Sequence, residues 1–106
     1  MTLSAMQHIV LIKFPQVLTE EDTRWINRHL SQWSERIEGI ARIHWGTEVS
    51  GRSRGYQWGL TIEFVSAEAE AQYHPHPVHQ EFAQWVAAAN GEVLAFDFPL
   101  ETTPSS

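Results

Sequence analysis

The spacing of apolar residues switches repeatedly between the period of a strand and that of a helix, and this order limits what the chain can fold into. Residues 8–14 (HIVLIKF) are apolar on both faces of an extended chain, which predicts a buried strand ending at Pro15. One face carries His8, Val10, Ile12 and Phe14, and the other carries Ile9, Leu11 and Lys13.

A helix is predicted next, from Thr19 to Gly39. Thr19 is followed by three acidic residues, and a hydroxyl that caps the first turn together with acids at its positive end favours a helix start. Gly39 suits the end of the helix. The apolar residues recur at helical spacing: Ile26, Leu30, Trp33 and Ile37.

Two strands that alternate between apolar and polar residues follow, joined by the loop SGRSRG at 50–55. We expect them to be antiparallel neighbours. The inward face of the first is predicted to carry Ala41, Ile43, Trp45, Thr47 and Val49. The inward face of the second is predicted to carry Tyr56, Trp58, Leu60, Ile62 and Phe64.

The last third of the chain predicts two helices and a strand. Ser66 caps a short helix that breaks at Pro75 and Pro77, and a second helix begins near Pro77. It ends at Asn90-Gly91, and 92–98 (EVLAFDF) forms the last strand. The inward residues of the second helix are predicted to be Phe82, Trp85, Val86 and Ala89. The domain therefore covers 7–99, between an N-terminal extension (1–6) and a disordered tail (100–106).

The resulting order, β-α-β-β-α-β, is the ferredoxin-like α+β pattern. Two helices can cover only one face of its four-stranded antiparallel sheet. The other face would expose Ile9 and Leu11, and an exposed apolar face of this size usually marks a partner surface. We expect two copies to pack face to face as a homodimer, which closes a dimeric α+β barrel.

Composition argues against several functions. The net charge is −6 and the few basic residues are scattered, so nucleic-acid binding is not expected. No apolar stretch approaches the roughly 20 residues of a membrane span, and the N-terminus lacks a signal-peptide pattern. Without cysteine there are no disulfides or thiolate ligands. The expected location is the cytoplasm.

The densest group of chemically active side chains lies at 73–79 (YHPHPVH), where two prolines make a rigid joint between helices. His79 falls in the first turn of the second helix, whose positive end disfavours imidazolium and favours the neutral ring that a general base needs. The Tyr73 phenol can donate a proton or polarise a carbonyl group. Asp97, within an apolar strand, needs a partner, for which a histidine is suitable.

Structural explanations for the same residues remain open at this stage. His76 can simply cap a helix through one backbone hydrogen bond, and His8, on an apolar strand face, can be a core residue. Asp97 can be tied to backbone amides. The aromatic residues Trp25, Trp58, Phe82 and Trp85 can be core residues, or together with His76 they can line a pocket for an apolar or aromatic ligand.

Motifs for other kinds of site are missing from the sequence. It has no glycine-rich phosphate loop, no G-x-S-x-G and no H-E-x-x-H, and we expect no cofactor. His74, His76 and His79 offer zinc ligands in principle, but their spacing fits no standard signature, so no metal site is predicted.

With these residues identified, the chain resembles the stress-responsive A/B barrel (Dabb) family from about residue 7 to 98. The matching segments are HIVLIKF, E-G-I and H-W-G near the second strand, G-Y before the third, Y-x-x-H-P-x-H at 73–79, and F-D-F at the end. The resemblance implies the ferredoxin-like dimeric barrel expected above.

The resemblance also implies candidate catalytic residues. One plant member of the family closes a linear polyketide by an aldol reaction without a cofactor, and its tyrosine and histidine correspond to Tyr73 and His79. Its first-strand histidine and terminal aspartate correspond to His8 and Asp97. His79 would then remove a proton next to a carbonyl, Tyr73 would stabilise the enolate oxygen and Asp97 would orient His79.

One position departs from that enzyme: its pocket histidine two residues after G-Y is Trp58 here. The resemblance therefore implies acid–base machinery of the cyclase or lyase type acting on a different small ligand. Two alternatives stay open, a non-catalytic stress-response dimer and a monooxygenase or haem-handling barrel.

Overall fold

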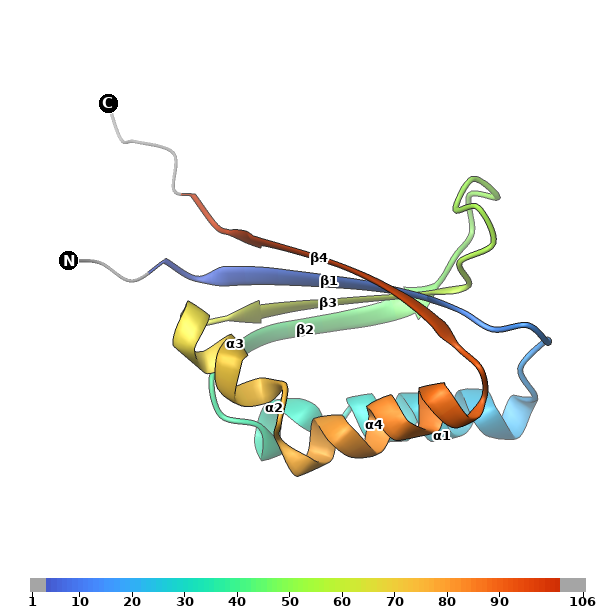
Figure 1. Ribbon diagram of the computed structural model, residues 1–106, viewed down its shortest axis with the longest axis horizontal. Coiled ribbons are helices and arrows are strands. Elements are labelled where there is room, and N and C mark those ends of the chain that lie inside the picture. The colour runs from blue at the N-terminus through green and yellow to red at the C-terminus, as the bar shows by residue number, and fades with distance from the viewer. Residues whose placement is uncertain (1–3, 102–106) are drawn as a thin grey trace.

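Four strands form one antiparallel sheet in the order β2-β3-β1-β4 in a computed structural model that describes residues 4–101 (Figure 1). The strands are β1 (Met6–Lys13), β2 (Ile40–Thr47), β3 (Trp58–Phe64) and β4 (Glu92–Pro99). The helices are α1 (Glu20–Leu30), α2 (Trp33–Arg36), α3 (Ala67–Tyr73) and α4 (Pro77–Ala88). The predicted ferredoxin-like fold is confirmed. The predictions about residues 1–3 and 102–106 lie outside the described part of the chain.

The helices lie on one side of the sheet, and the loop between β2 and β3 rises on the other side (Figure 1). The core fills the space between sheet and helices, where Trp33, Ile62 and Phe64 are completely buried. The remaining core residues come from both layers: Val10, Ile12, Phe14, Ile26, Leu30, Ile37, Trp58, Leu60, Ala69, Tyr73, Phe82 and Val86. The period-2 and period-3.6 patterns of the sequence therefore identified most of the core.

The predicted helix from Thr19 to Gly39 is wrong in two respects, because the segment forms two helices and the second ends at Arg36, before Gly39. The Ser31 hydroxyl donates to the Arg28 carbonyl (2.8 Å), which gives the backbone an alternative to continuing α1. After the turn, α2 restarts at Trp33. Gly39 does not end a helix but adopts a φ of 91°, and a Cβ there would lie 2.5 Å from the Ala69 Cβ.

The alternation expected for β2 is interrupted at its start. A bulge between Ile40 and Arg42 shifts the register against β3, so Ile40 faces the core and Ala41 is exposed. The pattern resumes at Ile43 and Trp45, which pack against the core as predicted. The prediction is wrong for Thr47, which is exposed, and for Val49, which lies beyond the end of β2 and is 94% exposed. Tyr56 lies before β3 rather than within it.

The face of the sheet turned away from the helices carries an apolar stripe. In the β1–β4 pairing, Ile9 lies opposite Phe96 and Leu11 lies opposite Leu94. Phe96 is 64% exposed and Leu94 is 50% exposed. This confirms that an uncovered apolar face exists. No helix among residues 4–101 is long and apolar enough to cross a membrane.

Replacement of Ile62 by alanine is expected to lower the free energy of unfolding by about 2–5 kcal/mol, because a fully buried side chain is removed from a packed core. Urea unfolding at one fixed protein concentration measures this change. Val49→Ala, at a side chain that is 94% exposed, serves as the control and should change stability by less than about 0.5 kcal/mol. Equal effects of the two substitutions would contradict the assigned core.

Candidate active site

A cavity of about 220 Å³ lies between the helix-covered face of the sheet and α4. An apolar cavity of about 150 Å³ can bind benzene, so this space suits a ligand of about one ring. Its polar wall consists of His8, Tyr73, His74 and His79. The apolar remainder is Val10, Ile12, Leu60, Phe82, Ala83, Val86, Val93 and Ala95.

His79 lies in the first turn of α4, and its Nδ1 is 2.8 Å from the carbonyl oxygen of His74. A carbonyl oxygen only accepts, so Nδ1 carries the proton and the neutral ring keeps a lone pair on Nε2. Burial is the main cause that lowers the pKa of His79. The carbonyl bond opposes the shift, and the charges of His74, His8 and His76 add to it. This ring is suited to accept a proton at neutral pH.

Tyr73 packs its ring against His79, with ring centroids 4.2 Å apart. The residue is 2% exposed. Burial raises the pKa of the phenol well above its usual value, and the charges of Glu70 and Asp97 raise it further. The hydroxyl therefore stays protonated, as a donor on the cavity wall beside a proton acceptor.

Asp97 binds His8 rather than His79, which corrects the expected partner. The register of β1 and β4 sets His8 directly opposite Asp97, and His8 Nδ1 lies 2.5 Å from Asp97 Oδ1. Burial alone would raise the pKa of Asp97, but hydrogen bonds from Glu70 and His8 and the nearby charges of His8 and His74 lower it overall. Asp97 is thus an ionised acceptor that orients His8.

Glu70 is a site residue that the sequence reasoning missed. It is 6% exposed, and its Oε2 lies 3.4 Å from His8 Nδ1. Burial and, secondarily, the neighbouring Asp97 raise the pKa of Glu70 to about 7. One signal for it was present: Glu70 precedes Tyr73 by three residues in a helix whose phase Ser66 fixes, so an inward Tyr73 implies an inward Glu70.

The remaining predicted ligand-binding residues divide into one inside the cavity and four outside it. Phe82 lines the cavity. His76 instead caps α4, because its Nδ1 accepts a hydrogen bond from the Val78 amide (3.1 Å). Trp25 and Trp85 stack on each other, with centroids 4.7 Å apart, away from the cavity. Trp58 is a buried core residue.

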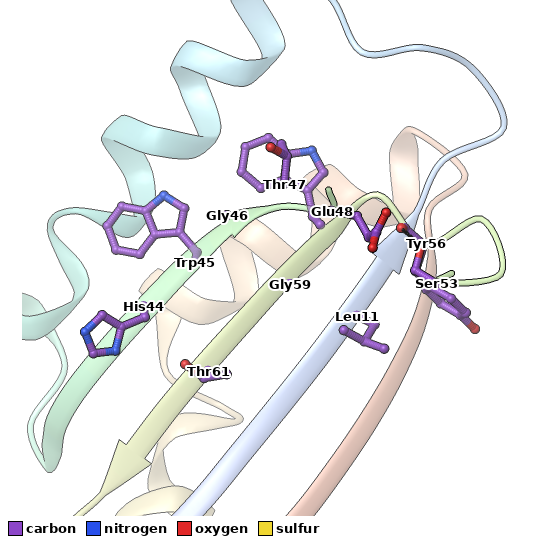
Figure 2. A pocket seen from close by; sticks show the side chains of 11 residues that line it. Leu11, His44, Trp45, Gly46, Thr47, Glu48, Ser53, Tyr56, Gly59 and Thr61 are labelled. Atoms are coloured by element: carbon purple, nitrogen blue, oxygen red, sulfur yellow. Dashed lines mark hydrogen bonds between the residues drawn. The ribbon is translucent and has the colours of Figure 1, made fainter. Parts of the chain in front are cut away.

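A second hollow, of about 360 Å³, lies over β2 and β3 (Figure 2). Its floor includes Gly46 and Gly59, which face each other across the two strands and leave a gap where side chains would stand. Glu48 lies at the rim of this hollow. Its carboxylate already accepts hydrogen bonds from the backbone amides of Ser50 and Gly51 in the β2–β3 loop. These bonds lower the pKa of Glu48. The hollow holds no acid–base pair comparable to Tyr73 and His79.

The fold and the cavity define a class of protein: a ferredoxin-like α+β domain with one histidine- and tyrosine-walled cavity between its sheet and α4. Residues 6–100 match the stress responsive A/B barrel domain (Dabb). The chain belongs to this family, as its resemblance indicated.

Named relatives and solved structures agree with this assignment. The chain is 30% identical to the stress-response A/B barrel domain-containing protein HS1 of Arabidopsis thaliana, over 88% of this chain and 87% of the relative. It is 24% identical to the olivetolic acid cyclase of Cannabis sativa, over 89% and 95%.

Two solved structures share the fold. The hydroxynitrile lyase of Passiflora edulis superposes with a TM-score of 0.81 at 17% identity, over 96% of this chain and 98% of that one. A dimeric ferredoxin-like protein of unknown function from Thermobifida fusca superposes with a TM-score of 0.79 at 18% identity, over 92% of both chains.

Replacement of His76 by alanine is expected to cost about 0.5–2 kcal/mol of stability, because the first turn of α4 loses its cap. His76→Asn should recover most of this loss, since asparagine is a good N-cap residue. Thermal unfolding of the two variants measures the difference. Equal stability of the wild type and His76→Ala would contradict the capping role.

Proposed function

We propose that this protein is an acid–base enzyme of the lyase or cyclase type that acts on a small apolar or aromatic carbonyl compound. The observation that carries the proposal is the juxtaposition of Tyr73 and His79 on one cavity wall, one a protonated donor and the other a neutral acceptor. The names of two similar proteins, a hydroxynitrile lyase and an olivetolic acid cyclase, support chemistry of this kind.

In the cyclase direction, His79 Nε2 removes a proton from the carbon next to a carbonyl group, and the C–H electron pair forms an enolate whose oxygen accepts a hydrogen bond from the Tyr73 hydroxyl. The enolate carbon then attacks a second carbonyl carbon of the same molecule, and the electron pair of that C=O bond moves to its oxygen, which takes the proton. In the lyase direction, His79 Nε2 removes the hydroxyl proton, the O–H electron pair forms the carbonyl group, and the C–C bond breaks with its pair leaving on cyanide, which takes the proton. The bond from His79 Nδ1–H to the His74 carbonyl stabilises the imidazolium that forms. The proton then returns to the product.

His8 provides a third polar group on the cavity wall. In its neutral form, the bond from Nδ1–H to Asp97 leaves Nε2 as the acceptor, so Asp97 acts as a positioning residue. The apolar remainder of the wall favours a ligand that is mostly hydrocarbon, held by few polar contacts. Trp58 lies in the core and does not reach this cavity.

Replacement of His79 by alanine or of Tyr73 by phenylalanine is expected to reduce turnover by about 10²–10⁴-fold, the usual contribution of one acid or base. Turnover is measured on a panel of aromatic α-hydroxynitriles and linear poly-β-ketones. Glu35→Ala, at an exposed side chain of α2 that lines neither the cavity nor the open face of the sheet, is the control and should keep wild-type turnover. Full activity of both cavity variants on an accepted substrate would exclude the mechanism and favour a non-catalytic ligand-binding domain.

We also propose that two copies pair through the open face of the sheet. The stripe of Ile9, Leu11, Leu94 and Phe96 is too apolar to be left in water, and the glycine-floored hollow beside it offers space for side chains of the partner. A two-fold axis parallel to the strands would place β4 of one copy over β2 of the other. The apolar stripe of each copy would then pack against the hollow of its partner, and this contact would occur twice in the dimer.

Replacement of Phe96 by glutamate is expected to convert the dimer to a monomer, because it places a charge in the buried interface. Light scattering during gel filtration measures the mass. Val17→Glu, at an apolar residue of the β1–α1 loop that is 88% exposed, is the control and should leave the dimer intact. A monomeric wild type, or a dimeric Phe96→Glu variant, would contradict this pairing.

A further inference from the structure

Three secondary-structure elements bring an imidazole and two carboxylates together behind the cavity. His8 comes from β1, Glu70 from α3 and Asp97 from β4, and one donor atom of each lies within 4.8 Å of the others. Only His8 also lines the cavity. The group is therefore distinct from the Tyr73–His79 pair and has no role in the proposed proton transfer beyond positioning His8.

The two carboxylates lack the positive charge that their proximity requires. Glu70 is 6% exposed, and its Oε1 is a buried acceptor with no hydrogen-bond partner among residues 4–101. Within this part of the chain, no lysine or arginine nitrogen lies within 4.0 Å of either carboxylate, and only the imidazoles of His8 and His74 do. An unpaired buried acceptor beside a second acid costs free energy unless a proton or a cation joins them.

We propose that His8, Glu70 and Asp97 bind one divalent transition-metal ion of the Zn²⁺ type. Bonds of about 2.0–2.2 Å at tetrahedral angles hold neighbouring donor atoms roughly 3.3–3.5 Å apart. The distance of 3.4 Å from His8 Nδ1 to Glu70 Oε2 already fits this spacing. The ion binds the Nδ1 lone pair of the Nε2–H tautomer of His8, so the ring proton moves from Nδ1 to Nε2; this removes the hydrogen bond to Asp97 and lets that pair separate.

The surroundings favour a zinc-like ion over magnesium, and they leave it a path of entry. An imidazole ligand suits Zn²⁺, whereas Mg²⁺ prefers an all-oxygen shell. The Asp97 side chain is 37% exposed, so a water molecule can complete the coordination from that side. His74 Nε2, 3.6 Å from Glu70 Oε2, is placed to donate to a ligating carboxylate from outside the first shell.

The test uses the full chain, freed of metal with a chelator and titrated with Zn²⁺ by calorimetry and with Co²⁺ by visible absorption. We expect one ion per chain, a visible Co²⁺ spectrum and a higher melting temperature, because the ion binds only the folded chain. Glu70→Gln and Asp97→Asn should each weaken binding at least tenfold. Glu68→Gln, an exposed glutamate of the same helix, removes the same charge and should bind as the wild type does.

If the wild type does not bind one Zn²⁺ ion per chain, the proposal is wrong. A proton shared between Glu70 and Asp97 would then explain how the two carboxylates lie so close together. Undiminished binding in either ligand variant would overturn the proposal as well, since the ion would then lie on other histidines. If Glu70→Gln does not fold, Asp97→Asn gives the same answer at a partly exposed side chain. His79→Ala should keep full Zn²⁺ affinity, which separates this site from the proposed reaction.

Discussion

β1 is hydrogen-bonded to a strand on each side, and the register of these two pairings determines where the functional groups lie. His8 sits between Ile62 of β3 and Asp97 of β4. A shift of either neighbour by one residue would turn its side chains to the opposite face. Asp97 would then point away from the helices, and His8 would lose its acceptor. Burial of Val10 and Ile12 under the helices holds β1 in the observed register.

The joint between α3 and α4 depends on local interactions of its own. His76 caps α4, Pro77 occupies its first position, and His79 reaches back to the carbonyl of His74, the residue that ends α3. These contacts fix Tyr73 and His79 next to each other, so the two side chains lose little conformational entropy when a ligand binds. A donor and an acceptor fixed in advance contribute more to a reaction than the same groups on a mobile loop.

Much of the fold could be predicted because apolar spacing reports which residues face the core. Ile26, Leu30, Trp33 and Ile37 are all buried, although the helix breaks between Leu30 and Trp33. That break and the bulge at Ala41 depend on hydrogen bonds of the backbone, which spacing does not encode. The helix break leaves the inward residues in place, whereas the bulge exchanges Ala41 for Ile40 on the core side, so most of the core was predictable even where the element boundaries were not.

The site was less predictable because its contacts join residues far apart in the chain. The sequence shows that Asp97 needs a partner, but only the strand register shows that the partner is His8 rather than His79. The tryptophans proposed for the cavity do not line it. Trp58 fills the core, and Trp25 and Trp85 stack on each other, while β1, β3 and α4 present other side chains to the cavity. Glu70 could be identified only from the helical spacing of α3, which places it on the same face as Tyr73, three residues later.

The protonation state of His79 tests the central claim most directly, by long-range ¹H–¹⁵N NMR of its imidazole during a pH titration. The proton on Nδ1 and the free Nε2 predict the Nδ1–H tautomer, and burial predicts a pKa below the ordinary 6.5. The neutral base would then persist at neutral pH and be lost only as the pH falls through that lower value. An Nε2–H tautomer would contradict His79 as the base, because the nitrogen that accepts the proton would already carry one.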